Sequence, residues 1–317
     1  MQDQRHVVLG ASGGAGNAIV HALVERGRTV RAVNRKGDAT VPEGVERVGA
    51  DIAIASGARN AVTGTDVVYM AAQPAYHRWA EEFPAMVESV IDATSTAGAR
   101  LVMVDNLYTY APGTGVMSED SPENSKTRKG RVRGQLTHML RSAHETGRVR
   151  VSIGRASDYF GPGTNNSAIT ALSIARAADG KSMRWLGRLD KRHSLAYLPD
   201  IAAAYVTLGE SDKADGDTWI LPHGPAPTGA EFLAAVNNTL PDHVTTGSLS
   251  KTMLLMAAPF HPMSRESLEV LYQWTDDFVV DDSKFQRVFG PSTTTPLDEA
   301  VHTTIARYRN HGAGVRA

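Results

Sequence analysis

A glycine-rich segment follows the first apolar stretch of the chain. The stretch 6–9 reads HVVL, and GASGGAG follows it at 10–16, ahead of a segment with helical spacing of apolar residues. Glycines at this G-x-x-G-x-x-G spacing permit a tight turn, close approach of the backbone to a pyrophosphate, and packing of the helix on the strand. The start of the helix offers free N–H groups to phosphates. The segment therefore predicts a dinucleotide site formed by Gly10, Ser12, Gly13, Gly14, Ala15 and Gly16.

The first half of the chain alternates between short apolar runs and amphipathic segments. We expect strands at 6–9, 29–33, 45–48, 66–70, 100–104 and 149–153, and helices at 15–26, 56–62, 79–97 and 127–146. Strand followed by helix, repeated, is typical of an α/β protein with a doubly wound parallel sheet, the Rossmann-like fold. Apolar runs such as 102–104 suit strands that are buried on both faces.

The alternation stops near residue 160, where the turn-forming segment GPGTNN occupies 161–166. We therefore predict a nucleotide-binding domain over 1–160 and a smaller C-terminal α/β substrate cap over 161–317. A strand at 194–198 and a helix at 200–209 are expected to return to the core. Helices at 231–240 and 265–274 are expected in the cap, and an amphipathic helix at 296–308 closes the chain.

Composition narrows the partners of the protein. The formal net charge is −1, which gives no electrostatic reason to expect a nucleic acid or an anionic membrane. The chain contains no cysteine, which excludes disulfides, cysteine-bound zinc and thiolate catalysis. No apolar stretch has the length of a signal peptide or a membrane span. We expect a cytoplasmic protein with a small-molecule substrate.

The segment after the second predicted strand predicts the form of the cofactor. A carboxylate here would bind the ribose 2′-hydroxyl of NAD and repel a 2′-phosphate, but the sequence has Asn34 and Arg35. Arg35 can pair with that phosphate, which favours NADP(H) over NAD. Further contacts are expected from residues that follow the third and fourth strands, Asp51, Ile52, Ala71, Ala72 and Gln73.

Several segments together resemble one superfamily. Besides the glycine loop and Asp51-Ile52, the segment 155–163 (RASDYFGPG) is similar to an R-x-x-x-x-Y/F-G-P-G motif, and 197–202 (YLPDIA) to Y-V-x-D-V-A. The chain therefore resembles the extended and atypical short-chain dehydrogenase/reductases, the NAD-dependent epimerase/dehydratase superfamily. The resemblance runs nearly end to end. It implies a Rossmann-like fold and nicotinamide chemistry, and a homodimer contact through helices 79–97 and 127–146.

The residues that normally carry the chemistry of this superfamily are altered. Its members use Y-x-x-x-K on the helix after strand five and a Ser or Thr just after that strand. Aligned on Gly130, Lys129 replaces the tyrosine and Arg133 the lysine, while Asn106 stands at the hydroxyl position. Arg133 can grip ribose hydroxyls, but a guanidinium, with an ordinary pKa above about 12, does not shuttle protons.

Two interpretations of Lys129 stay open. It lies four residues before Arg133 on the same helical face, and a nearby like charge disfavours its protonated form. It then serves as a proton relay while Asn106 orients a substrate carbonyl. Alternatively, Lys129 and Arg133 only bind phosphate or ribose, or lie in solvent.

Tyrosines offer other acids. Tyr108 follows strand five and Tyr159 follows strand six, at the edge where ligands bind such sheets, whereas Tyr110 is expected to pack in the core. Arg192 lies near the expected substrate entrance and suits an anionic group. No cluster predicts a metal site.

These observations favour an NADP(H)-dependent oxidoreductase acting on a small carbonyl or enone-like substrate, with altered proton-transfer residues. One alternative is a sugar-nucleotide epimerase or dehydratase, which needs a strong base to oxidise a hydroxyl temporarily. Another is a cofactor sensor without turnover, similar to the NmrA-type regulators that share this glycine loop.

Overall fold

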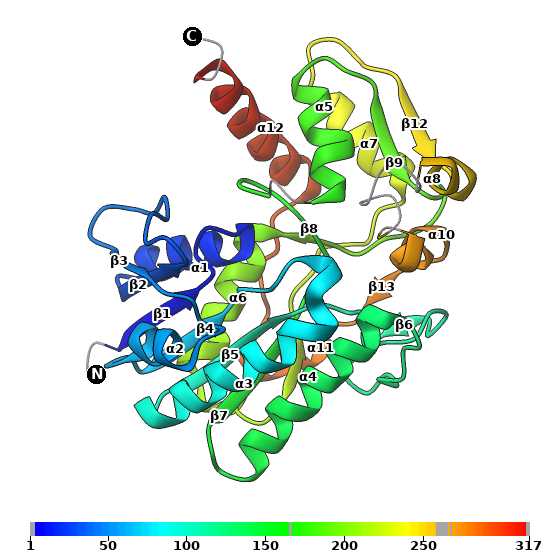
Figure 1. Cartoon of the computed structure of the whole chain (residues 1–317). Coiled ribbons are helices and arrows are strands. Elements are labelled where there is room, and N and C mark those ends of the chain that lie inside the picture. The colour runs from blue at the N-terminus through cyan, green and yellow to red at the C-terminus, as the bar shows by residue number, and fades with distance from the viewer. Residues whose placement is uncertain (1–3, 165–166, 258–265, 267, 315–317) are drawn as a thin grey trace.

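The central element is a sheet of seven parallel strands in the order β11-β7-β5-β4-β1-β2-β3 (Figure 1). The computed structural model describes residues 4–164, 167–257, 266 and 268–314. The strands are β1 (Arg5–Leu9), β2 (Thr29–Asn34), β3 (Glu46–Gly49), β4 (Val67–Met70), β5 (Arg100–Asp105), β7 (Arg150–Arg155) and β11 (Thr218–Ile220). The strand order reverses at β1, and ligands bind such sheets at the carboxyl edge beside that point. The predicted doubly wound parallel sheet is confirmed.

Helices cover both faces of the sheet because successive side chains of a strand point to opposite sides. Val7 and Leu9 of β1 join the core beneath α2 (Ala55–Val62), α3 (Trp79–Ala97) and α4 (Arg128–Glu145). Val8 joins the core beneath α1 (Gly14–Glu25) and α6 (Leu198–Glu210), with Phe285 of α11 (Ser283–Phe289). The apolar run at 7–9 is therefore buried on both sides, as its composition predicts.

A cap with its own core lies beyond the carboxyl edge of the sheet (Figure 1). Aromatic and aliphatic side chains such as Trp185, Phe232 and Trp274 fill it. Its elements are the π-helical turn Thr170–Ile174, α5 (Ala175–Ala178), β9 (Met183–Leu186), α7 (Gly229–Asn238), β12 (Thr246–Leu249), α8 (Lys251–Ala257), α10 (Tyr272–Thr275) and α12 (Leu297–Gly314). β9 and β12 pair in parallel.

Two short strand pairs connect the sheet to the cap. β8 (Asp158–Phe160) pairs with β10 (Leu195–Tyr197), and β6 (Val116–Met117) pairs with β13 (Val279–Val280). Two 3-10 turns, Tyr76–Arg78 and Asp212–Ala214, complete the described elements.

The chain crosses between the two parts more often than the predicted boundary at 160/161 implies. Helix α6, residues 198–210, packs on α1. The strand expected at 194–198 instead pairs with β8 outside the main sheet. β11 adds a seventh strand to the main sheet, and α11 packs on it. Its three residues are too few to produce a recognisable strand pattern.

Part of the predicted turn at 161–166 and of the predicted cap helix at 265–274 cannot be compared. Residues 165, 166, 265 and 267 lie outside the described residues. Within the described part of the chain, no helix combines the length and apolar character needed to cross a bilayer.

Candidate functional site

The glycine loop between β1 and α1 has the geometry that a close ligand approach requires. Gly10 has φ 91°, and a Cβ there would lie 2.6 Å from the backbone nitrogen of Ala72. A Cβ at Gly16 would lie 2.3 Å from the Gly10 carbonyl oxygen. Real Cβ atoms do not approach backbone this closely, so these two positions need glycine. The loop thereby holds the ends of β1 and β4 and the start of α1 together.

The first turn of α1 is open at its amino end. Gly13, the residue before the helix, provides no side-chain cap, and Ser12 and Gly13 are exposed. Uncapped N–H groups with the positive end of the helix dipole favour an anion. A Cβ at Gly14 would lie 3.2 Å from the Gly163 carbonyl oxygen, so the segment after β8 borders the same turn. The loop residues predicted to hold the pyrophosphate are thus brought together in a shape that suits it.

Asn34 connects the end of β2 to this loop. Its Nδ2 donates to Ser12 Oγ at 2.6 Å and to Asp38 Oδ1 at 2.8 Å, and its Oδ1 accepts from the Gly37 amide. Arg35 is exposed, with no hydrogen bond or ion pair to any residue that the structure describes. Asn34 therefore lies beside the loop as predicted, and the Arg35 guanidinium is free to pair with an anion.

Asp38 is a residue that the sequence reasoning missed. We expected no carboxylate at the end of β2, but Gly37, with φ 73°, turns the chain so that Asp38 meets Asn34. The only signal was the glycine three residues after the strand. An exposed carboxylate here competes with Arg35 in setting the preference between a ribose hydroxyl and a phosphate.

The residues predicted at the adenine side follow β3. The exposed Asp51 accepts a hydrogen bond from the Ala53 amide at 3.1 Å through Oδ1, and its Oδ2 has no hydrogen-bond partner among the described residues. Ile52 is buried in the core between the sheet and α2, so it supports the edge by packing.

The segment after β4 runs along the glycine loop. The Ala71 amide donates to the Leu9 carbonyl at 2.9 Å, and Ala71 and Ala72 are half-buried. Gln73 is exposed and accepts from Arg133 Nη2 at 3.0 Å. These three residues join the predicted site and link it to α4.

Arg133 lies in a buried aromatic cage on α4. Its guanidinium sits 4.4 Å from the Trp79 ring and 4.9 Å from the Phe83 ring, and Nη1 lies 3.0 Å from Asp105 Oδ1. That ion pair lacks the angles of a hydrogen bond, so Nε and Nη1 have no acceptor among the described residues. Arg133 is thus buried and held beside Asp105, and its contact with a ribose or substrate oxygen stays a prediction.

Lys129 is buried in an ion-pair cluster with two carboxylates from the segment before α10. Its Nζ donates to Glu266 Oε2 at 2.5 Å and Glu269 Oε2 at 3.0 Å, with the Glu266 carbonyl oxygen at 3.4 Å. Burial raises the pKa of both carboxyls, but the hydrogen bonds and charge of Lys129 outweigh it and lower them. All three ammonium protons are committed. The relay role of Lys129 stays a prediction, and this geometry disfavours it.

Tyr108 and Asn106 follow β5 as predicted, but each is held locally. Tyr108 is buried, and its hydroxyl lies 2.7 Å from the Tyr76 hydroxyl. Asn106 Oδ1 accepts from the Tyr108 amide at 3.1 Å, which leaves its amide group to donate. Burial, then the charges of Tyr76 and Asp158, raise the pKa of Tyr108 well above its usual range, so it keeps its proton.

Tyr110 and Arg155 form a buried network beneath this edge. Arg155 is fully buried and donates to Asp105, Tyr110, Glu123 and Thr137. The packing role expected for Tyr110 is confirmed. The same network holds the carboxylate of Asp105, which forms the ion pair with Arg133. It therefore fixes the position of Arg133 from within the core.

Tyr159 and Arg192 border the cap side. Tyr159 is half-buried in β8, and burial, opposed by a hydrogen bond with Tyr205, raises its pKa to about 12. Arg192 is exposed, and its backbone is held by Asp277. The structure also places Asp158 against the buried His193, a pair that the sequence reasoning did not single out. Their substrate roles remain predictions.

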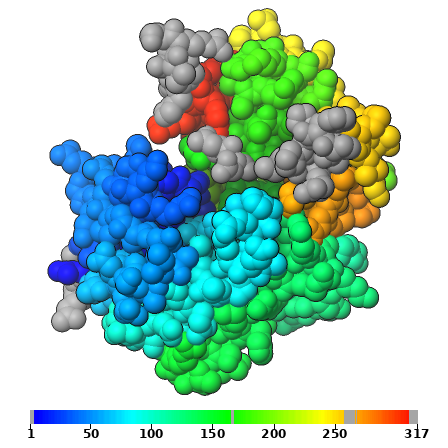
Figure 2. Space-filling model, viewed as in Figure 1, coloured from blue at the N-terminus to red at the C-terminus, as the bar shows by residue number. Residues whose placement is uncertain are grey.

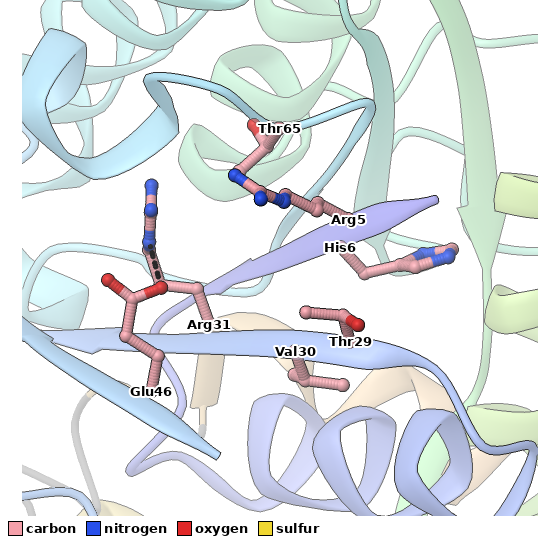
Figure 3. A pocket seen from close by; sticks show the side chains of 7 residues that line it. All are labelled: Arg5, His6, Thr29, Val30, Arg31, Glu46 and Thr65. Atoms are coloured by element: carbon pink, nitrogen blue, oxygen red, sulfur yellow. Dashed lines mark hydrogen bonds and ion pairs between the residues drawn. The ribbon is translucent and has the colours of Figure 1, made fainter. Parts of the chain in front are cut away.

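A surface pocket lies at the opposite edge of the sheet. Figure 3 shows it at the amino ends of β1, β2 and β3, lined by Arg5, His6, Thr29, Val30, Arg31, Glu46 and Thr65. Arg31 and Glu46 pair across it at 2.9 Å. Ligands of such sheets bind at the carboxyl edge, so this pocket is no candidate. In Figure 2 the N-terminal segment and the cap flank an indentation on the carboxyl side. Among the described residues, no cluster of three or more His, Cys, Asp or Glu side chains has an arrangement that could hold a metal ion.

Known structures with the same fold span the whole chain. The UDP-glucuronic acid 4-epimerase of Bacillus cereus in complex with NAD is 14% identical, with a TM-score of 0.79 and coverage of 97% of this chain and 99% of that one. The Bordetella bronchiseptica enzyme WbmH in complex with NAD+ is 18% identical, with a TM-score of 0.76 and coverage of 98% of this chain and 99% of that one. The UDP-glucose 4-epimerase of Thermus thermophilus in complex with NAD is 16% identical, with a TM-score of 0.75 and coverage of 96% of this chain and 99% of that one.

Sequence comparison at the level of whole families identifies the chain more directly. No curated protein matches it. The family described as "NAD dependent epimerase/dehydratase family" matches residues 6–221, from β1 to just past β11. That range contains the glycine loop, Lys129 and the segment 155–163. The chain belongs to the NAD dependent epimerase/dehydratase family, as the resemblance implied.

Proposed function

We propose that this protein is an NADP(H)-dependent oxidoreductase that acts on a small carbonyl or enone-like substrate. The observation that carries the proposal is the glycine loop with the uncapped start of α1, set beside an exposed and unpaired Arg35. The loop suits two phosphates, and the guanidinium suits a third. Several similar structures hold NAD, which supports a nicotinamide dinucleotide here.

The residues that would hold the cofactor follow four neighbouring strands. The loop 10–16 would bind the pyrophosphate, Asn34 and Arg35 the adenine ribose and its phosphate, and Asp51 the adenine. Residues 71–73 and Arg133 would lie along the remainder. When bound, the nicotinamide supplies hydride chemistry, while the protein supplies position and polarity.

The polar groups at the nicotinamide side suit a carbonyl oxygen. The amide of Asn106 is a donor, and Tyr108 remains protonated. Donors aimed at an oxygen stabilise the negative charge that develops there as a carbonyl is reduced. A strong base for oxidising a hydroxyl is absent from the usual position of the family, since Lys129 stands there.

Two measurements test this function. Fluorescence titration with NADPH, NADP+, NADH and NAD+ should show tighter binding of the phosphorylated pair, and Arg35→Ser should remove about tenfold of that preference while NADH binding is unchanged. NADPH consumption should then be found within a panel of aldehydes, ketones and enones. Equal or tighter binding of NADH by the wild type would overturn the NADP assignment.

A second candidate is a sugar-nucleotide epimerase or dehydratase. The similarity to two epimerase structures over at least 96% of the chain, cap included, favours it. Incubation with UDP-sugars and NAD+, followed by chromatography of the sugars, distinguishes it. Tight dinucleotide binding without turnover of either substrate class would instead favour a sensor.

A further inference from the structure

Asp158 and His193 meet where the carboxyl edge of the sheet joins the cap. Asp158 is the first residue of β8, and His193 lies two residues before β10, which pairs with β8 in parallel. The His193 Nε2 atom lies 2.9 Å from Asp158 Oδ2. The two residues are 35 positions apart, and only the pairing of these short strands brings them together.

The hydrogen bonds of His193 fix where its protons are. Its Nδ1 lies 3.0 Å from the Gln273 carbonyl oxygen, which can only accept, so Nδ1 carries a hydrogen. In a neutral ring Nε2 would then be a bare lone pair facing a carboxylate oxygen. Two acceptors at hydrogen-bond distance repel each other, so a proton lies between them. The pair holds one proton more than a neutral imidazole and a carboxylate.

The surroundings leave one exit for that proton. The imidazole is 2% exposed and is stacked on Trp274 at 4.3 Å, with Phe278 at 5.1 Å. Asp158 has 28% of its side chain exposed, and its Oδ1 has no hydrogen-bond partner among the described residues. Proton exchange with a ligand or with water therefore runs through the carboxyl group.

Asp158 begins β8 shortly after β7 (Arg150–Arg155) ends at the carboxyl edge of the sheet. Its charge raises the pKa of Tyr76 after β4, Tyr108 after β5, Tyr159 in β8 and Tyr272 in α10, each after the larger effect of burial. Arg133 on α4 acts on the first three in the opposite direction. These tyrosines hold their protons tightly, which makes them poor donors to a substrate.

We propose that the Asp158–His193 pair is the proton donor of this site, in place of the tyrosine that the family normally uses. The role rests on the proposed function. As a substrate oxygen at the carboxyl edge gains negative charge, the pair gives it the shared proton. The pair is left as a carboxylate and a neutral imidazole, and it takes a proton back from water.

Asp158→Asn tests the proposal with little change in shape. The new amide donates to Nε2 of a neutral imidazole, so the hydrogen bond stays while the shared proton is lost. We expect unchanged dinucleotide affinity, a fall in kcat of about 10²–10⁴-fold and a smaller change in KM. Asp190→Asn is the matched control, because Asp190 is exposed and, among the residues that the structure describes, pairs with Arg188 alone.

Nitrogen-15 NMR of the histidine rings at neutral pH tests the proton directly, without turnover. His223 is an internal reference, since its Nδ1 donates to the Leu221 carbonyl and its Nε2 accepts from the Ser157 amide, which fixes a neutral ring. Wild-type His193 should differ from His223 at Nε2, and Asp158→Asn should make them alike.

The outcomes separate this proposal from the function on which it rests. A wild-type His193 signal like that of His223, together with a carbon-13 shift of the Asp158 carboxyl group typical of a carboxylate, overturns the shared proton, even if a variant fails to fold. Full activity of Asp158→Asn in an enzyme that binds NADPH and reduces carbonyls overturns the donor role alone. Absence of dinucleotide binding in the wild type overturns the proposed function, and the donor role with it.

Discussion

The two halves of the carboxyl edge differ in how they relate to the family. Around β1 and β2 the chain keeps the glycine loop, the uncapped helix start and polar side chains beside them. Around β5 and α4 the usual hydroxyl, tyrosine and lysine positions hold Asn106, Lys129 and Arg133. The last two are buried and ion-paired. One half keeps the shape that suits a dinucleotide, whereas the other has buried ion pairs at the positions where the family normally carries reactive groups.

The binding half breaks most completely at Gly16. In Gly16→Ala the new Cβ would lie 2.3 Å from the Gly10 carbonyl oxygen, so the loop must move and we expect dinucleotide affinity to fall at least about 100-fold. Calorimetric titration with NADPH measures it. Gly134→Ala in α4 is the control, because its Cβ would come no closer than 3.7 Å to Thr109 Oγ1. Equal affinities in the two variants would contradict the loop's role.

The second half is tested by Lys129→Met. Removal of the ammonium leaves Glu266 and Glu269 close together without their cation, and we expect a loss of about 3 kcal/mol in the free energy of unfolding. Urea denaturation measures it, and adding Glu266→Gln and Glu269→Gln should restore part of the loss. A variant of full stability without turnover would instead revive the proton-relay interpretation of Lys129.

The smallest expected effect is a loss of stability of the fold at acidic pH. The pKa values of Glu266 and Glu269 are lowered in the folded state from the ordinary value of 4.5, so their contribution to stability is present above that value. It is lost as the pH falls through the lower folded values. The urea midpoint should drop on acidification below about pH 4.5, by less in Glu266→Gln/Glu269→Gln. Identical acid curves would show that the carboxylates do not stabilise the fold.

Local pattern in the sequence determined most of the sheet and the binding half. Short apolar runs that alternate with amphipathic segments located six of the seven main strands, because parallel strands buried on both faces are apolar over several consecutive residues. The glycine spacing located the loop, because the space at Gly16 is limited by residues close along the chain, and the space at Gly10 by the two residues that follow β4. β11 was not predicted, because three residues are too few to show a recognisable strand pattern.

Tertiary structure alone decided the chemistry half. Lys129 meets carboxylates 137 and 140 positions away, and Asp158 meets a histidine 35 positions away. Nothing near Lys129 in the sequence reveals whether its charge is compensated, since a pairing across the domain boundary depends on how the cap docks. Charge and proton placement are long-range properties, whereas strands, helices and turns are set by short-range sterics and periodic burial.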